Sequence, residues 1–214
     1  MSSYPAMAKA PTRKYSPRRS REERREQLLD AALEIVDTQG FGAFSIEAVA
    51  READLAKTVV YASFDNPDAL LSAMVDRELE RAVADLAAAI PRPPYADPAE
   101  VLQAALGAVL QAARRRPATW RIFVLPADGM PPAARAAVER NHQQFLLQIE
   151  PLVSWGLEYL RLDHLDAELT TAILIAGAEQ GIRLALTDPD HFTDDRLIGF
   201  ATALVTSFIV PRQA

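Results

Sequence analysis

The sequence of 214 residues contains no cysteine, which excludes disulfides, thiolate metal sites and a cysteine nucleophile and is compatible with a reducing cytoplasm. It has no apolar run close to the ~20 residues that a helix needs to span a bilayer. Its N-terminus, MSSYPAMAKAPTRKYSPRRS, also lacks the apolar segment of a secretory signal. We therefore expect a cytoplasmic protein without a membrane partner.

Acidic side chains are absent from residues 1–21, although the whole chain has a net charge of −6. The basic side chains of this segment are Lys9, Arg13, Lys14, Arg18, Arg19 and Arg21. Because the segment has no hydrophobic periodicity, we predict a disordered basic arm over residues 1–20 that orders on a polyanion such as DNA. A solvated tail that binds nothing has the same composition.

Stretches that alternate between apolar and polar residues, as strands do, are also missing. Apolar residues recur at helical spacing instead, as Leu29, Leu33 and Val36 do on one stripe. Capping residues, glycines and prolines separate the helical stretches. The predicted helices span residues 21–39, 46–53, 57–64, 67–90, 98–114, 132–160, 166–186 and 194–210, with a short one between 117 and 126. The sequence therefore predicts an all-α fold of about nine or ten helices.

Residues 21–66 have the spacing of a helix-turn-helix DNA-binding domain. Ser45 stands where the second helix needs an N-cap. Asp54 stands in the turn, where the backbone is left-handed and an Asp is tolerated. The third helix begins near Lys57 and would present its outer side to the major groove of DNA.

This part of the chain resembles the tetracycline-repressor (TetR) family of bacterial transcription regulators. The ordered pattern comprises Leu28-Leu29-x-x-Ala32, Gly40-Phe41, Ser45-Ile46-x-x-Val49-Ala50, Ala53, Lys57-Thr58-x-x-Tyr61-x-x-Phe64 and Leu70-Leu71. Three places depart from it: Asp54-Leu55 replaces a frequent Gly-Val, Ala56 replaces a capping Ser or Thr, and Pro67 replaces a Lys that commonly contacts phosphate. The resemblance implies a homodimeric repressor that a small effector releases from a palindromic DNA operator.

The resemblance also indicates which residues would contact DNA. The first residues of the third helix would reach base edges, its tyrosine would donate to a phosphate, and the two capping residues would present helix N-termini to phosphates. Arginines of the arm would lie along the phosphates or enter a minor groove. The predicted set is Arg18, Arg19, Arg21, Ser45, Lys57, Thr58, Val59, Tyr61 and Asn66. Each of them also has an ordinary explanation as a solvated, packed or capping residue.

For residues 67–214 the resemblance implies a helical effector-binding and dimerisation domain. Its candidate pocket residues, for an apolar or amphipathic effector, are Trp120, Phe123, His142, Phe145, Trp155, Tyr159 and Gln180. Plain core packing is the more frequent role of any one such aromatic residue. We predict no cofactor and no metal, because His142, His164 and His191 have no partner at ligand spacing.

Small residues on the last two predicted helices would permit close approach of a second subunit. They are Gly177, Gly181, Ala185, Gly199 and Ala203. In the TetR family the final helix pair forms a four-helix bundle between subunits, so the resemblance implies a dimer interface here. The same residues could instead belong to the core of one subunit.

No nucleophile elbow, phosphate-binding loop or pair of catalytic carboxylates is present in the sequence, so we do not predict an enzyme. Two alternatives remain open beside the regulator. One is an architectural protein that binds DNA without sequence preference, and the other is an all-α enzyme with an accidental helix-turn-helix spacing. The sequence identifies neither the operator nor the effector, and it does not separate a repressor from an activator.

Overall fold

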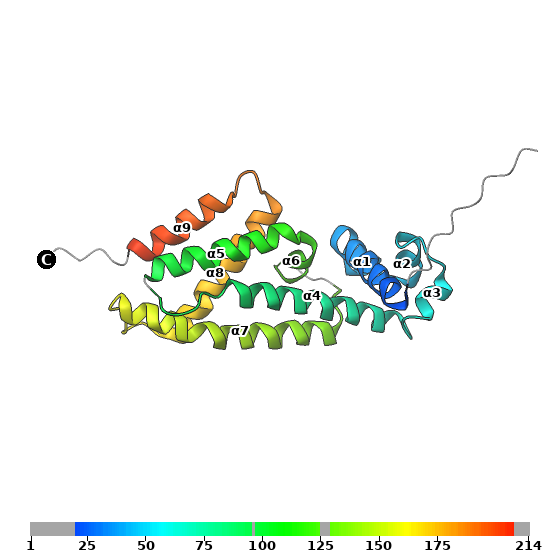
Figure 1. The fold of residues 1–214 in the computed structure, drawn as a ribbon, viewed down its shortest axis with the longest axis horizontal. Coiled ribbons are helices and arrows are strands. Elements are labelled where there is room, and N and C mark those ends of the chain that lie inside the picture. The colour runs from blue at the N-terminus through cyan, green and yellow to red at the C-terminus, as the bar shows by residue number, and fades with distance from the viewer. Residues whose placement is uncertain (1–19, 96, 125–128, 208–214) are drawn as a thin grey trace, which may run out of the picture.

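The computed structural model describes residues 20–95, 97–124 and 129–207. These residues form nine α-helices and one short 3₁₀ helix, Phe41–Ala43, with no strand among them. The α-helices are α1 Arg21–Gln39, α2 Ile46–Glu52, α3 Lys57–Tyr61, α4 Pro67–Ala89, α5 Pro98–Arg115, α6 Pro117–Val124, α7 Pro132–Tyr159, α8 Ala167–Thr187 and α9 Asp194–Ser207. The predicted all-α fold is confirmed (Figure 1).

Local capping hydrogen bonds explain where the helices begin. The Asn66 side chain accepts from the Ala69 amide at 2.8 Å and starts α4, with Pro67 as the first helical residue. Ser20 forms a capping box with Glu23 at the start of α1. Each of these bonds joins residues three positions apart, so the sequence alone is sufficient to define these starts.

The third helix is shorter than predicted, ending at Tyr61 rather than Phe64. The amides of Ser63 and Phe64 both donate to the carbonyl of Val60, at 2.9 Å each. Sharing one carbonyl tightens the backbone into a turn and ends the regular helix. Phe64 still lies in the core, as predicted from its spacing to Val60.

The headpiece, defined as α1 to α3, shares one apolar core with the first turns of α4. Its buried side chains include Leu28, Leu29, Ile35, Ile46, Val49, Val60, Leu70 and Met74. Figure 1 shows α4 running from the headpiece into the rest of the molecule. A domain boundary drawn between residues 66 and 67 therefore passes through a single packed core.

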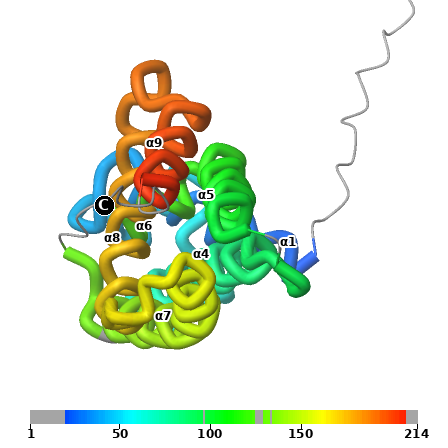
Figure 2. The backbone as a smooth tube through the Cα atoms, turned by 90° about the vertical axis from the view of Figure 1, so that its left-hand side faces the viewer, coloured from blue at the N-terminus to red at the C-terminus, as the bar shows by residue number. Residues whose placement is uncertain are grey.

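The body, defined as the remainder of α4 together with α5 to α9, surrounds a second core. Its buried side chains are Leu110, Ala112, Ala113, Trp120, Val124, Ile182 and Ala185. Helix α9 packs along α5, and α7 packs along α8, whereas α8 and α9 make at most slight contact with each other. Figure 2 shows α9 beside α5, with α7 on the other side of the body.

Helix α8 is long and apolar enough to cross a membrane by length and composition, with a mean hydropathy of 1.2 over its most apolar part. Only 17% of that part is buried, and Leu169, Ile173 and Leu174 are exposed. A stretch of this length was not predicted from the sequence. One such helix is weak evidence for a membrane segment, because an exposed apolar face is also typical of a protein interface.

Candidate functional site

Helix α3 presents a polar face at the end of the molecule opposite α9 (Figure 1). Val60 is fully buried against the headpiece core, which fixes the rotation of this short helix. Lys57 and Thr58 are exposed, Tyr61 is 55% exposed, and Val59 is half-buried. The side chains predicted to contact DNA on this helix thus share one accessible surface.

The turn between α2 and α3 holds that face in place. Asp54 has a φ of 51°, in the left-handed region predicted for it. The amide of Leu55 donates to the carbonyl of Ala50 at 2.9 Å and closes the turn. From α1, the Gln27 side-chain amide donates to the carbonyl of Ala53 at 2.7 Å. The helix-turn-helix pair is thereby hydrogen-bonded to α1 as well as packed on it.

An ion pair on the exposed surface, which was not predicted from the sequence, joins the two helices of the motif. Lys57 Nζ lies 2.5 Å from Glu47 Oε1, and both side chains are more than half exposed. The hydrogen bond from Lys57 lowers the pKa of Glu47 below its usual value. Exposed pairs of this kind contribute little to stability, so an approaching phosphate or base can compete for the lysine.

The other predicted DNA-contact residues are placed as follows. Ser45 caps α2 by accepting from the Ala48 amide at 3.1 Å, and Asn66 caps α4. Arg21 is exposed at the first position of α1. Arg18 and Arg19 lie outside the described residues. The structure therefore brings α3 and the caps of α2 and α4 onto the headpiece, and it does not place the arm.

A buried carboxylate connects the body with the headpiece. Glu78 of α4 is 0% exposed, and its Oε2 accepts from the Thr119 hydroxyl of α6 at 2.5 Å. Its Oε1 accepts from Arg77 Nε at 2.8 Å and from an Arg81 guanidinium nitrogen at 2.9 Å. A buried charge of this kind is tolerated only when it is fully paired. No motif in the sequence predicted this cluster.

Arg77 extends the cluster to α1. Its guanidinium lies 2.9 Å from Glu26 and 2.8 Å from Asp30, two carboxylates of α1. Burial disfavours the charged guanidinium, but the hydrogen bonds and charges of Glu26, Glu78 and Asp30 outweigh it and raise the pKa of Arg77. Helices α1, α4 and α6 are thus held together by one continuous polar network.

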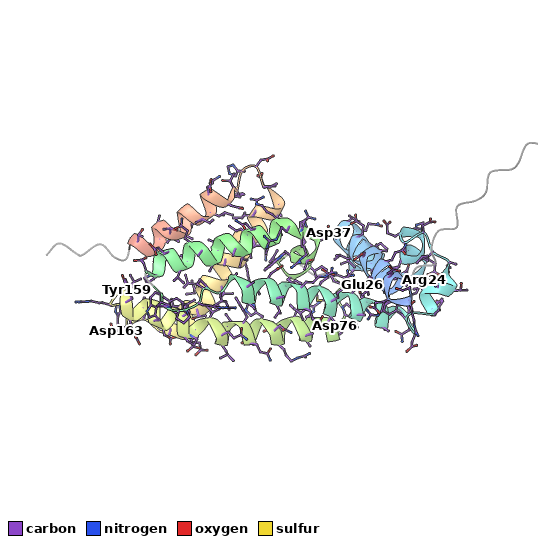
Figure 3. The ribbon with its side chains drawn as sticks, viewed as in Figure 1. Arg24, Glu26, Asp37, Asp76, Tyr159 and Asp163 are labelled. Carbon is purple, nitrogen blue, oxygen red and sulfur yellow. The ribbon has the colours of Figure 1, made fainter. Side chains whose placement is uncertain are left out.

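Helix α6 touches both the headpiece and the interior of the body. Arg121 pairs with Asp37 at the C-terminal end of α1 at 2.8 Å, and the Asp37 side chain is only 10% exposed. Figure 3 labels Asp37 at the end of α1 that faces α6. Ile122 packs into the headpiece core, whereas Trp120 and Phe123 line a cavity in the body. A displacement of α6 would therefore be felt on both sides.

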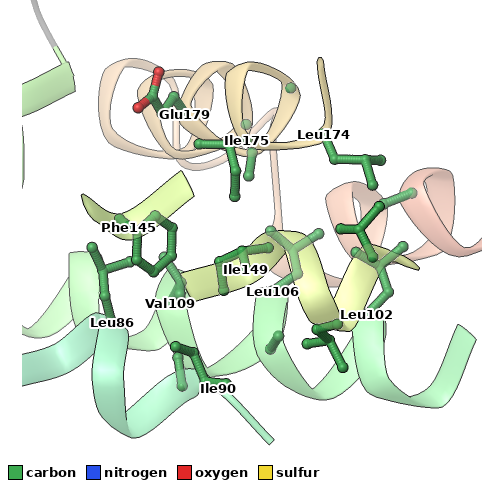
Figure 4. A pocket seen from close by; sticks show the side chains of 18 of the residues that line it. Leu86, Ile90, Leu102, Leu106, Val109, Phe145, Ile149, Leu174, Ile175 and Glu179 are labelled. Carbon is green, nitrogen blue, oxygen red and sulfur yellow. The ribbon is translucent and has the colours of Figure 1, made fainter. Parts of the chain in front are cut away.

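That cavity has a volume of about 1060 Å³ and lies among α4, α5, α6, α7, α8 and α9. Its lining includes six of the seven predicted pocket residues: Trp120, Phe123, His142, Phe145, Trp155 and Gln180. Much of the remaining lining is aliphatic, for example Leu86, Leu106, Val109 and Ile149 (Figure 4). These aliphatic residues were not predicted as pocket residues, because their spacing is that of any buried helix face.

Tyr159 does not line the cavity, which corrects its assignment to the pocket. Its ring is 52% exposed at the end of the body away from the headpiece (Figure 3). It packs against Trp155 with 5.8 Å between ring centroids. Four residues after Trp155 on α7, it extends the aromatic cluster outward rather than into the interior.

The predicted interface residues divide between a surface and the core. Gly177, Gly199 and Ala203 are exposed and Gly181 is half-buried, with open space where a Cβ would be added to each glycine. Ala185 is only 1% exposed and packs in the core of the subunit, so its assignment to the interface is wrong. The accessible apolar side chains next to these residues are Leu169, Ile173, Leu174, Phe200 and Leu204. We call this surface the α8–α9 face.

Histidines and carboxylates do not gather into a metal site within the described ranges. No group of three histidines, aspartates or glutamates suitable for a metal ion occurs there. His142 lies 3.1 Å from Glu179, and His191 contacts Arg196.

Known proteins resemble this chain in both sequence and fold. Residues 28–74 match the model of the bacterial regulatory proteins of the tetR family. The transcriptional repressor KstR of Rhodococcus jostii (strain RHA1), a helix-turn-helix protein, is 33% identical over 98 residues. These residues are 46% of this chain and 44% of that relative, so the match spans less than half of either protein.

Solved structures extend the likeness to the whole fold. A TetR-like transcriptional regulator from Rhodococcus sp. RHA1 superposes with a TM-score of 0.72 at 23% identity, covering 92% of this chain and 100% of that one. The fatty acid degradation regulator FadR from Bacillus halodurans superposes with a TM-score of 0.64 at 14% identity, covering 94% and 99%. At these identities the superpositions show a common fold of headpiece and body.

Proposed function

The chain belongs to the tetR family of bacterial regulatory proteins, and we propose that it is a cytoplasmic, homodimeric transcriptional repressor that a small effector releases from DNA. The observation that carries the proposal is the pairing of two sites in one molecule. An exposed polar face on α3 suits the major groove, and a large apolar cavity lies in the body. We assign it no catalytic activity.

We propose that Lys57 and Thr58 read base edges in the major groove. Lysine donates to guanine oxygen and nitrogen acceptors, and threonine donates to a base edge or packs on a thymine methyl. Val59 would add apolar contact, and the exposed hydroxyl of Tyr61 would donate to a phosphate. Ser45, Asn66 and Arg21 would position the headpiece on the backbone without reading sequence.

We propose the α8–α9 face as the dimer interface. A cluster of exposed large apolar side chains is unusual on the surface of a monomer, and it surrounds open small residues that allow close helix approach. An isologous contact would cover this face on both subunits at once. Gly177, Gly181, Gly199 and Ala203 would lie at the contact.

Helix α6 supplies a route from effector to DNA. An effector in the cavity would contact Trp120 and Phe123, and the same helix is bonded to the headpiece through Arg121 and Asp37 and to α4 through Thr119 and Glu78. Effector binding would favour one position of α6, and the headpieces of the dimer would separate to a spacing that no longer fits two half-sites. The effect on DNA is limited by the difference in effector affinity between the two states.

Selection of DNA from a random pool by the full-length protein tests the proposal. We expect an inverted repeat whose half-site centres are about one helical turn, or a multiple of it, apart. The selected site should bind at least about 10³-fold more tightly than scrambled DNA of equal length. Equal affinity for both would instead identify an architectural DNA-binding protein.

The basic arm gives a prediction on salt dependence. We expect deletion of residues 1–19, which removes Lys9, Arg13, Lys14, Arg18 and Arg19 but keeps the cap at Ser20, to flatten the plot of log K against log salt. The slope should decrease by about 0.9 for each phosphate that the shortened protein no longer neutralises. Deletion of residues 1–8, which contain no basic side chain, is the matched control. Equal slopes for both deletions would show that the arm makes no phosphate contact.

A further inference from the structure

The cavity is large and has very few polar groups. It is at the upper end of the size range of sites for small molecules, and its walls are mostly Leu, Val, Ile and aromatic side chains from six helices. Figure 4 shows several of them, among them Leu102, Leu106 and Ile149. The few polar groups of the lining therefore decide which end group a long apolar ligand can carry.

The charges in the lining are of one sign. Asp166 and Glu179 contribute carboxylates, whereas no lysine or arginine belongs to the described lining. The arginines at the end of α5 are already paired, Arg114 with Asp194 and Arg116 with Asp85. A ligand carboxylate would lose its water in this cavity without gaining an opposite charge, and it would be repelled by the two protein carboxylates.

The N-terminus of α8 does not compensate for the missing cation. Helix N-termini attract anions through unpaired amides. Here the side chain of Asp166 already accepts from the Leu169 amide at 2.8 Å and places a negative charge at that end of the helix. His142 is engaged as well, because its Nδ1 lies 3.1 Å from Glu179.

One buried donor in the lining has no partner. Trp120 is 4% exposed, and its Nε1 has no hydrogen-bond acceptor among the described residues. An indole nitrogen can only donate, and buried donors in folded proteins are almost always paired. Since the Trp120 side chain lines the cavity, a ligand oxygen is the acceptor that its surroundings lack.

Building on the proposed function, we propose that the effector is a large apolar molecule without negative charge that carries an oxygen accepting a hydrogen bond from Trp120. Esters, ketones and other neutral carbonyl compounds belong to this class, and free fatty acids do not. The side-chain amides of the lining, such as Asn141 and Gln180, bond a neutral oxygen as readily as a charged one, but they cannot neutralise a carboxylate.

Competition against the neutral dye Nile red tests the charge preference, with dodecanoate and methyl dodecanoate as probes of equal chain length. We expect the ester to displace the dye from the native protein at a concentration at least tenfold lower. Because any apolar site favours an ester to some degree, the decisive measurement is the ester-to-acid ratio in two variants. Glu179→Lys should lower this ratio at least tenfold by improving dodecanoate binding.

The matched control is Glu179→Gln, which breaks the contact with His142 equally but adds no cation. Its ratio should lie between those of the native protein and Glu179→Lys. Ester affinity should change less than about threefold in both variants. Equal binding of acid and ester by the native protein, or a ratio that Glu179→Lys leaves unchanged, would overturn the proposal.

The hydrogen bond is tested separately by Trp120→Phe, which keeps an apolar ring but removes the donor. We expect the affinity for methyl dodecanoate to fall about fivefold, the value of one ordinary hydrogen bond. The affinity for dodecane, which has no oxygen, should not change. Trp155→Phe alters the other tryptophan of the lining and should not separate the two ligands. Equal losses for ester and alkane in Trp120→Phe would overturn the assigned acceptor.

Operator binding is measured in the same samples and keeps the two proposals apart. Tight ester binding without release of DNA would contradict effector-controlled repression and leave the ligand class standing. Release of DNA by dodecanoate at lower concentration than by its ester would support effector control and overturn the ligand class.

Discussion

Gly199→Arg is expected to convert the protein from a dimer to a monomer and to weaken operator binding by about a hundredfold or more. Gly199 lies exposed on α9, has open space at its Cβ position and does not line the cavity. An arginine fits there in a single subunit, and it also favours the helix over glycine. In a dimer it would bury two like charges at the two-fold axis, where each is costly to remove from water.

The weaker DNA binding follows because the two headpieces are no longer linked. Two linked headpieces gain about 10²- to 10⁴-fold in avidity over one, provided that both half-sites can be reached together. Sedimentation measures the subunit number, and titration of operator DNA measures the affinity.

Ala84→Arg is the matched control, since Ala84 is exposed on α4, away from the α8–α9 face and the cavity lining. This variant should remain a dimer with native DNA affinity. If Gly199→Arg sediments as an intact dimer, the α8–α9 face is not the interface, and the subunits meet elsewhere.

Replacement of Lys57 and Thr58 by alanine is expected to remove most of the preference for operator over scrambled DNA. Each well-placed contact to a base edge contributes about 1–3 kcal/mol of discrimination, so two together correspond to a loss of about 10²-fold or more. Both side chains are exposed and the ion pair of Lys57 is worth little, so the free energy of unfolding should change by less than about 1 kcal/mol.

Glu47→Ala separates base reading from the ion pair. It removes the same Lys57–Glu47 contact but leaves the lysine free to reach DNA. This variant should keep its operator preference and bind DNA somewhat more tightly, because one carboxylate has left the surface. If the double alanine variant still discriminates between operator and scrambled DNA, sequence is read by other residues.

The positions of the helix starts were determined by the sequence because the hydrogen bonds that define them are local. Asn66 and Asp166 each accept from an amide three residues ahead, whatever the rest of the chain does. The left-handed turn at Asp54 and the burial of Val60 also follow from short-range spacing. These local rules were sufficient to identify a helix-turn-helix headpiece and an all-α body.

The rotation of a helix about its axis is less well determined by spacing. Gly177, Gly181 and Ala185 follow one another by four residues, but a helix has 3.6 residues per turn. Each step of four drifts by about 40°, so Ala185 lies about 80° around the helix from Gly177. Packing against α5 and α6 then turned Ala185 into the core and left Gly177 exposed. Tyr159 on α7 was misassigned for a related reason, since its stacking on Trp155 did not place it in the cavity.

Contacts between distant residues were decided only by the tertiary structure. Glu78 became a buried hub because α6 places Thr119, 41 positions later in the chain, within hydrogen-bond distance. Arg121 reaches Asp37 across 84 positions, and the open indole donor of Trp120 exists only because six helices leave a cavity around it. The sequence by itself determined the kind of protein, through patterns within about ten residues. The connection between the headpiece and the cavity depends on how the helices pack, because charge pairing and enclosed volume arise only between elements that the chain folds together.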